Sequence, residues 1–270
     1  MVNRKTVLFT DLDGSLLDLN TYSFEKARPA LNFFKSKKIP VIFCSAKTRD
    51  EQLYYQEKLG IDDPFIVENG GAIYIRKDYF DFEYTHTACR DGFYIIELGY
   101  AVEKIIRDLE KTAEEAGIRF WSYSNLDLEA ISQATGLDRK AAQRARCRRY
   151  SETVTRLFGD AHNIETFFAG LAEKNLQCVP GGKFYSVMGP NDKGMAIKIL
   201  IDLLGRQANS PVCSAGVGDS INDLPMLSAV DRPFLVQKPN GHWETISVPG
   251  LEKINGAGPE GWNQLPRKLF

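Results

Sequence analysis

Short apolar runs alternate with amphipathic stretches along the first part of the chain. Runs of β-branched and aromatic residues bounded by turn residues are typical of buried strands, whereas apolar positions that follow the helical period are typical of helices. An alternation of the two predicts a parallel sheet with helices on both faces. The predicted strands are 6–10, 40–44, 64–67 and 72–75, and the predicted helices are 24–35 and 49–58.

The pattern changes in the middle of the chain and returns near its end. The middle stretch has its own order of elements, with predicted strands at 93–97 and 119–123, a helix at 102–116 and a hairpin-like stretch at 177–188. Such an interruption of an α/β pattern indicates an inserted domain. We therefore predict an α/β core formed by residues 1–85 and 190–270, and an α+β domain inserted between them at 86–189.

Acidic residues follow the predicted strand 6–10 directly. Asp11 and Asp13 stand where this strand ends, and Gly14 lets the backbone turn away. Their spacing keeps both carboxylates on one side of the extended chain, and ligands of open α/β sheets bind outside the carboxyl ends of the strands. Such a pair can hold a hard cation, although two aspartates here can also be simple turn formers. A calcium loop is excluded, because Leu16 stands where an EF-hand needs glycine.

Three further polar clusters follow in order. Residues 45–49 come after the predicted strand 40–44, residues 191–194 open an amphipathic helix, and residues 218–223 follow a second buried run at 212–217. The four clusters resemble the DxD, Ser/Thr, Lys and GDxxND motifs of the haloacid dehalogenase superfamily of phosphatases. The resemblance implies that superfamily's doubly wound parallel-sheet core. Because the insertion lies between the serine and lysine motifs, it also implies the larger α+β cap class, the C2B type.

The resemblance assigns a catalytic role to four residues. Asp11 is implied as the nucleophile that forms an aspartyl phosphate, and Asp13 as the acid that protonates the leaving alkoxide and then activates water. Lys193 is implied to offset the charge of the carboxylates and the phosphate, and Ser45 to donate a hydrogen bond to a phosphoryl oxygen. The alternatives are an exposed lysine at a helix start and a serine that only caps a helix.

The expected cofactor is Mg²⁺. This ion prefers near-octahedral coordination by oxygen atoms, and the chain has no His or Cys cluster with the spacing of a zinc site. The expected ligands are Asp11, Asp13 through its backbone carbonyl, Asp219, Asn222 and Asp223.

Four longer strings narrow the resemblance. Residues 68–71 (ENGG), 149–152 (RYSE), 181–189 (GGKFYSVMG) and 258–263 (GPEGWN) look like segments of the mannosyl-3-phosphoglycerate phosphatase family, and the likeness runs over 7–263. It implies a magnesium-dependent phosphatase that releases phosphate from mannosyl-3-phosphoglycerate and leaves mannosylglycerate, an osmolyte-type product. The alternatives are a phosphatase of glucosyl-3-phosphoglycerate or sucrose phosphate, a sugar phosphomutase, and a non-catalytic sugar-phosphate sensor.

The predicted cap contains a strongly basic stretch at 138–156, which suits a substrate with anionic groups beyond its phosphate. A solvated helix face or an RNA-binding patch has a similar composition. Arg149 and Lys183 are the candidates for the glycerate carboxylate, since arginine pairs well with planar carboxylates. The other substrate-binding candidates are Lys47, Glu68, Asn69 and Gly70, and Trp262 is expected to dock the tail of the chain.

Composition limits the remaining possibilities. The 270 residues with 43% hydrophobic content suffice for one or two domains with a real core. The five cysteines have no CxxC spacing, which predicts no disulfide framework and favours the reducing cytoplasm. No secretory signal or membrane span is expected. The net charge of −1 gives no reason to expect nucleic acid. The expected partner is a small phosphorylated sugar acid, and the oligomeric state stays open.

Overall fold

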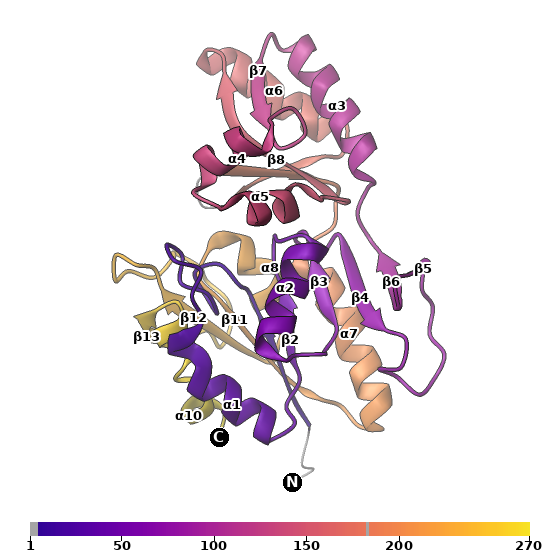
Figure 1. Cartoon of the computed structure of the whole chain (residues 1–270), viewed down its shortest axis with the longest axis vertical. Coiled ribbons are helices and arrows are strands. Elements are labelled where there is room, and N and C mark those ends of the chain that lie inside the picture. The colour runs from indigo at the N-terminus through magenta and orange to yellow at the C-terminus, as the bar shows by residue number, and fades with distance from the viewer. Residues whose placement is uncertain (1–4, 182–183) are drawn as a thin grey trace.

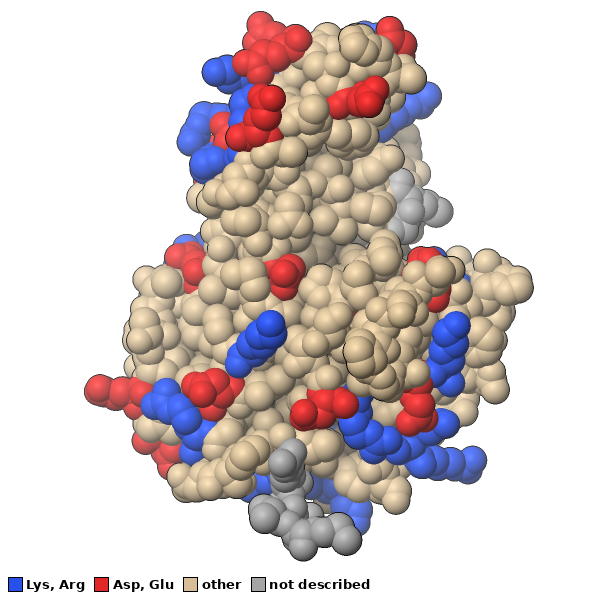
Figure 2. Space-filling view, turned by 180° about the vertical axis from the view of Figure 1, so that it is seen from behind, with Lys and Arg blue, Asp and Glu red and all other residues tan. Residues whose placement is uncertain are grey.

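The computed structural model describes residues 5–181 and 184–270, which form two lobes (Figure 1). The chain passes from the larger lobe to the smaller one near residue 100 and returns near residue 190. On the face shown in Figure 2, acidic and basic side chains are interspersed rather than gathered by sign. Within the described residues, no helix combines the length and the apolar character needed to cross a membrane.

The larger lobe is built on one nine-stranded sheet. In sheet order its strands are β13 (Glu252–Ala257), β12 (Arg232–Gln237), β11 (Cys213–Gly218), β1 (Thr6–Thr10), β2 (Val41–Cys44), β3 (Phe65–Val67), β4 (Ala72–Arg76), β6 (Phe93–Glu97) and β5 (Ala88–Arg90). The strands from β13 to β3 pair in parallel, and β4, β6 and β5 continue the sheet in antiparallel pairing. The predicted parallel core is confirmed, with an antiparallel edge added to it.

Helices cover both faces of this sheet, because alternate strand residues point to opposite sides. Leu8 packs in the core that contains Phe34 of α1, whereas Phe9 packs in the core that contains Ile197 of α7. Pro29 stands in the first turn of α1, where its missing N–H costs nothing. The helical elements of this lobe are η1 (Glu25–Ala27), α1 (Arg28–Ser36), α2 (Arg49–Leu59), α7 (Lys193–Ala208), η2 (Ile221–Asp223), α8 (Leu224–Ala229), α9 (Pro259–Trp262) and α10 (Leu265–Leu269).

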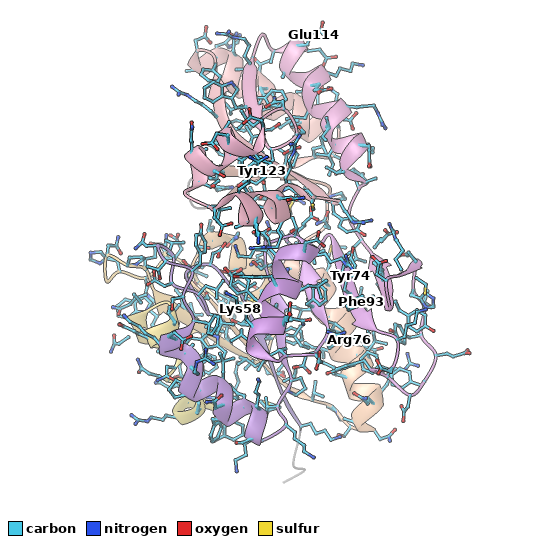
Figure 3. The ribbon with its side chains drawn as sticks, in the orientation of Figure 1. Lys58, Tyr74, Arg76, Phe93, Glu114 and Tyr123 are labelled. Carbon is cyan, nitrogen blue, oxygen red and sulfur yellow. The ribbon has the colours of Figure 1, made fainter. Side chains whose placement is uncertain are left out.

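The smaller lobe has an antiparallel four-stranded sheet in the order β7 (Arg119–Ser122), β8 (Ser151–Phe158), β10 (Phe184–Met188) and β9 (Gln177–Gly181). Helices α3 (Val102–Glu115) and α6 (Ala161–Glu173) pack together against this sheet. A second helix pair, α4 (Leu128–Thr135) and α5 (Arg139–Arg146), lies between the sheet and the larger lobe, where α5 contacts α2 (Figure 1). Tyr123 lies on this underside of the smaller lobe (Figure 3).

The predicted range 86–189 for the inserted domain stays a prediction. Strands β5 and β6 fall inside this range, yet they belong to the larger sheet, where β6 pairs with β4 and β5 pairs with β6. Phe93 of β6 is buried in the larger lobe and packs against Tyr74 of β4 (Figure 3). The apolar pattern of 93–97 indicates a strand, but it carries no information about which sheet the strand joins.

The tail of the chain docks through Trp262, as predicted. Its side chain is fully buried, and its ring lies edge-on to Phe34 with centroids 5.6 Å apart. The indole N–H donates to Thr10 Oγ1 at 3.0 Å, and this hydroxyl donates to the backbone oxygen of Asp11 at 2.6 Å. The tail therefore supports the strand end from which the first acidic cluster projects.

Candidate active site

The polar clusters meet where the parallel strands of the larger lobe end. Asp11 follows β1, Ser45 follows β2, and Asp219 follows β11, which pairs with β1. This edge faces the smaller lobe, because the Thr48 hydroxyl just after β2 donates to the Arg144 carbonyl of α5 at 2.8 Å. The site thus lies at the carboxyl ends of the strands, where open α/β sheets bind their ligands.

Lys193 stands at the centre of the site. Its Nζ lies 2.7 Å from Asp11 Oδ1 and 2.6 Å from Asp223 Oδ1, and its side chain is 1% exposed. Burial opposes the charge on this amine, but the two carboxylates outweigh burial and raise the pKa of Lys193 well above its ordinary value. Lys193 is therefore a buried ammonium group rather than the exposed lysine of the alternative.

Two of three clustered, buried aspartates contact this ammonium. Asp11, Asp219 and Asp223 each offer an oxygen within 4.8 Å of the others. Burial raises the pKa of Asp11 to about 7 against the lowering effect of Lys193, and burial also raises the pKa of Asp219 well above its ordinary range. Asp219 Oδ1 is buried without a hydrogen-bond partner among the described residues. An all-oxygen set with an unsatisfied buried carboxylate suits a hard divalent cation.

The loop after β11 is ordered by its own acid. Asp223 Oδ2 accepts hydrogen bonds from the backbone N–H of Asp219 at 3.0 Å and of Ser220 at 3.1 Å. Asn222 Oδ1 accepts from Ser220 Oγ at 2.5 Å. Direct coordination by Asn222 and by the backbone carbonyl of Asp13 stays a prediction.

Asp13 pairs with a different lysine. Lys47 Nζ lies 2.9 Å from Asp13 Oδ2 and 3.3 Å from Glu51 Oε1, and the lysine side chain is 8% exposed against 36% for Asp13. Of the two carboxylates that contact Lys47, Asp13 is therefore the one that is open to an incoming ligand. Gly14 is required beside it, because a Cβ there would come 2.6 Å from Asp219 Oδ2.

Ser45 is not the cap of the following helix. Thr48 caps α2, since its Oγ1 accepts from the Glu51 N–H at 3.3 Å while Glu51 Oε2 accepts from the Thr48 N–H at 2.9 Å. The buried Ser45 Oγ accepts from the Lys47 N–H at 3.3 Å. No acceptor for the Ser45 hydroxyl hydrogen occurs in the described part of the chain, which leaves it available to a phosphoryl oxygen.

The loop after β3 has an unusual backbone. Glu68, Asn69 and Gly70 have φ values of 50°, 55° and 92°, and a Cβ on Gly70 would come 2.0 Å from the carbonyl oxygen of Asp192. Asn191 Nδ2 donates to the Asn69 carbonyl at 3.4 Å. The side-chain oxygens of both asparagines are buried and have no partner within the described ranges, so they can accept from a ligand.

Asn191 was missed as a site residue by reasoning from the sequence. Its only signal was its place at the start of the string 191–194, two residues before Lys193. The structure buries it completely beside Asn69, which the sequence had singled out.

Glu68 points toward the smaller lobe rather than toward the aspartates. Its Oε1 accepts from the Arg149 N–H at 3.0 Å, and its Oε2 accepts from the Tyr150 N–H at 3.0 Å and from Ser151 Oγ at 2.7 Å. A substrate contact by Glu68 stays a prediction. In this arrangement its carboxylate instead accepts hydrogen bonds from residues 149–151 at the junction of the two lobes.

Arg148 and Arg149 are neighbours in the basic stretch, but their side chains lie in different surroundings. Arg149 is exposed and lines a pocket of about 550 Å³ at the junction, together with Arg90 and Glu97. Arg148, which the sequence did not single out, donates from Nη1 to the Ala46 carbonyl at 3.2 Å, directly beside Ser45. Lys183, the second carboxylate candidate, lies outside the described residues.

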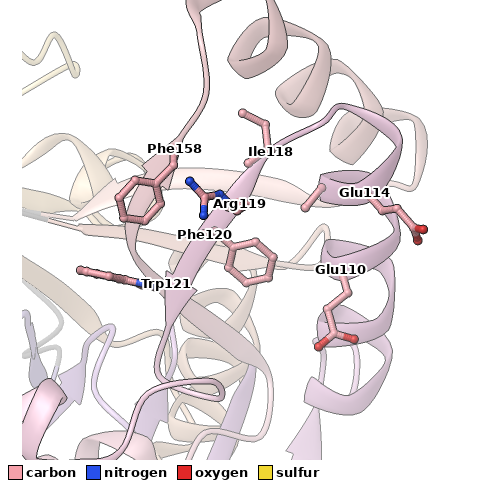
Figure 4. A pocket seen from close by; sticks show the side chains of 8 residues that line it. Glu110, Glu114, Ile118, Arg119, Phe120, Trp121 and Phe158 are labelled. Atoms are coloured by element: carbon pink, nitrogen blue, oxygen red, sulfur yellow. The ribbon is translucent and has the colours of Figure 1, made fainter.

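A separate pocket of about 530 Å³ lies in the smaller lobe (Figure 4). Residues of α3, β7 and the end of β8 line it, including Glu110, Trp121 and Phe158, whose two rings meet edge-on. The predicted site residues do not contribute to its lining.

The chain is similar to known proteins over most of its length. The family described as haloacid dehalogenase-like hydrolase matches residues 8–241. The chain is 42% identical over 267 residues to a glucosyl-3-phosphoglycerate/mannosyl-3-phosphoglycerate phosphatase of Methanococcoides burtonii, covering 98% of this chain and 97% of the relative. It is 40% identical over 230 residues to a mannosyl-3-phosphoglycerate phosphatase of Pyrococcus furiosus, covering 85% and 90%. A solved structure from Thermoplasma acidophilum shares the fold over 98% of each chain, with a TM-score of 0.69 and 18% identity.

Proposed function

The chain belongs to the family of haloacid dehalogenase-like hydrolases and is a phosphatase of phosphoric monoesters, and from this premise we propose that its substrate is mannosyl-3-phosphoglycerate. One observation supports this cluster as the place of the reaction: the buried Lys193 joins Asp11 to Asp223 beside Asp219. The curated relatives that bear the name of this activity support the choice of ester. Glucosyl-3-phosphoglycerate is the second candidate, because the Methanococcoides burtonii relative is named for both esters.

The proposed reaction has two displacements. A carboxylate oxygen of Asp11 bonds to phosphorus while the bond from phosphorus to the glycerate oxygen breaks, and Asp13 gives its proton to that oxygen. Asp13 then takes a proton from water, the water oxygen bonds to phosphorus, and the bond to Asp11 breaks to release phosphate. Splitting the reaction in this way suits phosphate monoesters, whose uncatalysed hydrolysis is extremely slow.

The other residues of the site supply charge and position. Lys193 holds the attacking carboxylate, and its ammonium compensates charge that gathers as the phosphate arrives. Ser45 offers its hydroxyl hydrogen to a phosphoryl oxygen. An incoming phosphate competes with Asp13 for the ammonium of Lys47, which lets Asp13 serve the leaving group.

We assign Mg²⁺ as the divalent cation. Asp11 and Asp219 are its proposed carboxylate ligands, and Asp223 orients the loop that carries Asp219. When bound, the ion supplies positive charge next to the phosphoryl oxygens. The oxygen-only character of the cluster supports this assignment, since Mg²⁺ prefers oxygen ligands and keeps several waters.

The proposed location is the cytoplasm, and the proposed partner is the small phosphorylated sugar acid alone. Five free cysteines, among them the exposed Cys89 and Cys147, support a reducing compartment.

A phosphate-release assay tests the substrate. The purified protein is given mannosyl- and glucosyl-3-phosphoglycerate, sucrose phosphate and simple hexose phosphates, each with and without Mg²⁺. The highest kcat/KM is expected for mannosyl-3-phosphoglycerate with Mg²⁺. A preference for a sugar phosphate that lacks the glycerate carboxylate contradicts the assignment. Transfer of the phosphoryl group to a sugar instead of water would identify a phosphomutase.

A further inference from the structure

We propose that Glu68 is a positioning residue that fixes the smaller lobe against the catalytic loop 45–47, and thereby sets the place of that lobe over Asp11 and Asp13. We name residues 148–151, which lead from α5 into β8, the return segment. The inference rests on the phosphatase activity proposed above, but half of its test needs no turnover.

The side chain of Glu68 is committed to the return segment. Its two oxygens accept from two backbone N–H groups and one hydroxyl, those of Arg149, Tyr150 and Ser151, at 2.7 to 3.0 Å. The residue is 1% exposed, so these hydrogen bonds are shielded from water. Hydrogen bonds to an ionised acceptor are roughly twice as strong as neutral ones. A single carboxylate thus orders three consecutive residues of the return segment.

The backbone of Glu68 is hydrogen-bonded to the catalytic loop 45–47. Its N–H donates to the Lys47 carbonyl at 3.1 Å, and the next N–H, that of Asn69, donates to the Ser45 carbonyl at 3.0 Å. Glu68 also holds a φ of 50°. A positive φ is costly for a residue with a side chain, and it persists only where the surroundings determine it. Glu68 therefore joins the loop that carries Ser45 and Lys47 to the return segment through one residue.

A second set of contacts runs parallel to the first. Arg148 Nη1 donates to the Ala46 carbonyl at 3.2 Å and to Ser151 Oγ at 2.9 Å, and Ser151 Oγ in turn donates to Glu68. Glu68, Ser151, Arg148 and the loop 45–47 hence form a closed network. A network closed in this way holds the return segment, and with it the smaller lobe, in one place against the loop 45–47.

The position of the smaller lobe matters for catalysis because the lobe covers the site. Strand β9 contacts η2, which carries Asn222 and Asp223, and α5 contacts α2. Misplacement of substrate by about 1 Å can cost on the order of 10²-fold in rate. A large sugar-acid ester that reaches both lobes should feel such a shift, whereas a small ester that occupies only the phosphate site should not.

The first experiment measures the junction without substrate. In Glu68→Gln the side chain keeps its shape, but an NH₂ group replaces one acceptor and faces N–H donors. Hydrogen exchange followed by mass spectrometry should show the amides of Arg149 and Tyr150 exchanging at least about tenfold faster than in the native protein. The matched control is Glu97→Gln at the same junction, since among the described residues the Glu97 carboxylate accepts from the Tyr150 hydroxyl and the Arg90 guanidinium but from no backbone N–H of the return segment. Unchanged exchange in Glu68→Gln overturns the proposal, because a residue that only binds substrate leaves the free protein unaltered.

The second experiment measures turnover of two esters. Glu68→Gln should raise KM for mannosyl-3-phosphoglycerate and lower its kcat/KM by about 10- to 100-fold, while kcat/KM for p-nitrophenyl phosphate should stay within about threefold. Equal losses on both esters contradict a positioning role, because they would place the defect in the phosphate site itself.

A third variant keeps the test decisive if Glu68→Gln does not fold. Ser151→Ala removes only the hydroxyl that links Glu68 to Arg148. It should show the same division between the two esters at a smaller size, and no division overturns the proposal. If the native protein does not hydrolyse mannosyl-3-phosphoglycerate at all, the substrate assignment fails, and the exchange measurement still decides the role of Glu68.

Discussion

Lys193 and Asp11 form a fully buried ion pair, with Nζ 2.7 Å from Oδ1 and neither side chain more than 6% exposed. Asp223 shares the same ammonium at 2.6 Å. A buried charge that loses its partner is strongly unfavourable, so the two aspartates and the lysine depend on one another. Lys193 is therefore expected to matter both for the free energy of unfolding and for the proposed reaction at Asp11.

Lys193→Met should lower both the stability of the protein and its turnover. The change keeps the volume but leaves buried carboxylates uncompensated, and the free energy of unfolding should fall by about 3 kcal/mol, the low end for a broken buried pair because Asp11 can take up a proton. Turnover should fall by at least about 10³-fold, since the charge acts directly at the reacting group. Urea unfolding and phosphate release measure the two effects. Lys198→Met, an exposed lysine of the same helix, is the control and should change neither.

Asp11→Asn and Asp13→Asn should differ in kind. An amide is no nucleophile, so Asp11→Asn should abolish turnover while the fold survives. Asp13→Asn should still be phosphorylated by substrate but should lose roughly 10²–10⁴-fold in turnover, the reach of general acid–base catalysis. Mass spectrometry of acid-quenched protein detects the phosphorylated form. Near-native turnover in Asp11→Asn would exclude a covalent intermediate on this residue.

Removal of the metal should stop the enzyme reversibly. A chelator should abolish phosphate release and added Mg²⁺ should restore it, whereas Ca²⁺ should bind yet support little turnover because it prefers more ligands in looser geometry. Asp219→Asn should weaken Mg²⁺ binding, measured by calorimetry, by at least about tenfold. Full activity after exhaustive chelation would disprove the proposed metal site.

Arg149→Ala tests which basic residue meets the glycerate carboxylate. If Arg149 binds it, kcat/KM for mannosyl-3-phosphoglycerate should fall. The corresponding loss of transition-state stabilisation should be about 1.5 kcal/mol, the low end for a charged hydrogen bond because the side chain is exposed. A small phosphate ester should be nearly unaffected. Arg148→Ala is the comparison, and it should affect both esters because Arg148 holds the loop that carries Ser45. Equal behaviour of the two variants would remove Arg149 from the substrate site.

Gly70→Ala should be poorly tolerated. A Cβ at this position meets the Asp192 carbonyl at 2.0 Å, just before Lys193, and the φ of 92° adds strain. We expect a loss of at least about 3 kcal/mol in the free energy of unfolding, the upper end for backbone strain alone. Gly92→Ala separates the two causes, because its φ is 81° and an added Cβ has nothing within 4 Å. If both variants lose the same stability, close packing at Gly70 is not the reason for its glycine.

The sequence was sufficient for the parts of the site that depend on strand ends. Asp11, Ser45 and Asp219 each follow a buried run, and parallel strands bring such ends to one edge. The same reasoning had no access to contacts between lobes. Glu68 meets residues 149–151 across more than 80 positions of chain, and no periodicity in the sequence links them.

Neighbouring residues of one type were also indistinguishable from sequence alone. Arg148 and Arg149 stand side by side in the same basic stretch, and only the path of the chain into β8 decides that Arg148 reaches Ala46 while Arg149 faces solvent. Similarly, the pattern of 93–97 predicted a strand, and its pairing with β4 emerged only in three dimensions.

The sheet order also determines when this site can come into being during synthesis. Strand β1 leads into Asp11, the proposed nucleophile, and is the first strand to be made, but its two neighbours are β2 and β11, and β11 begins at Cys213. Such distant pairing makes closure of the sheet a late event in folding. A nascent chain can pair β1 with β2, but the other edge of β1, and the side chain of Asp11 beside it, lack their partners until Lys193 and β11 have emerged from the ribosome. Phosphatase activity therefore has to wait until synthesis has passed Asp219.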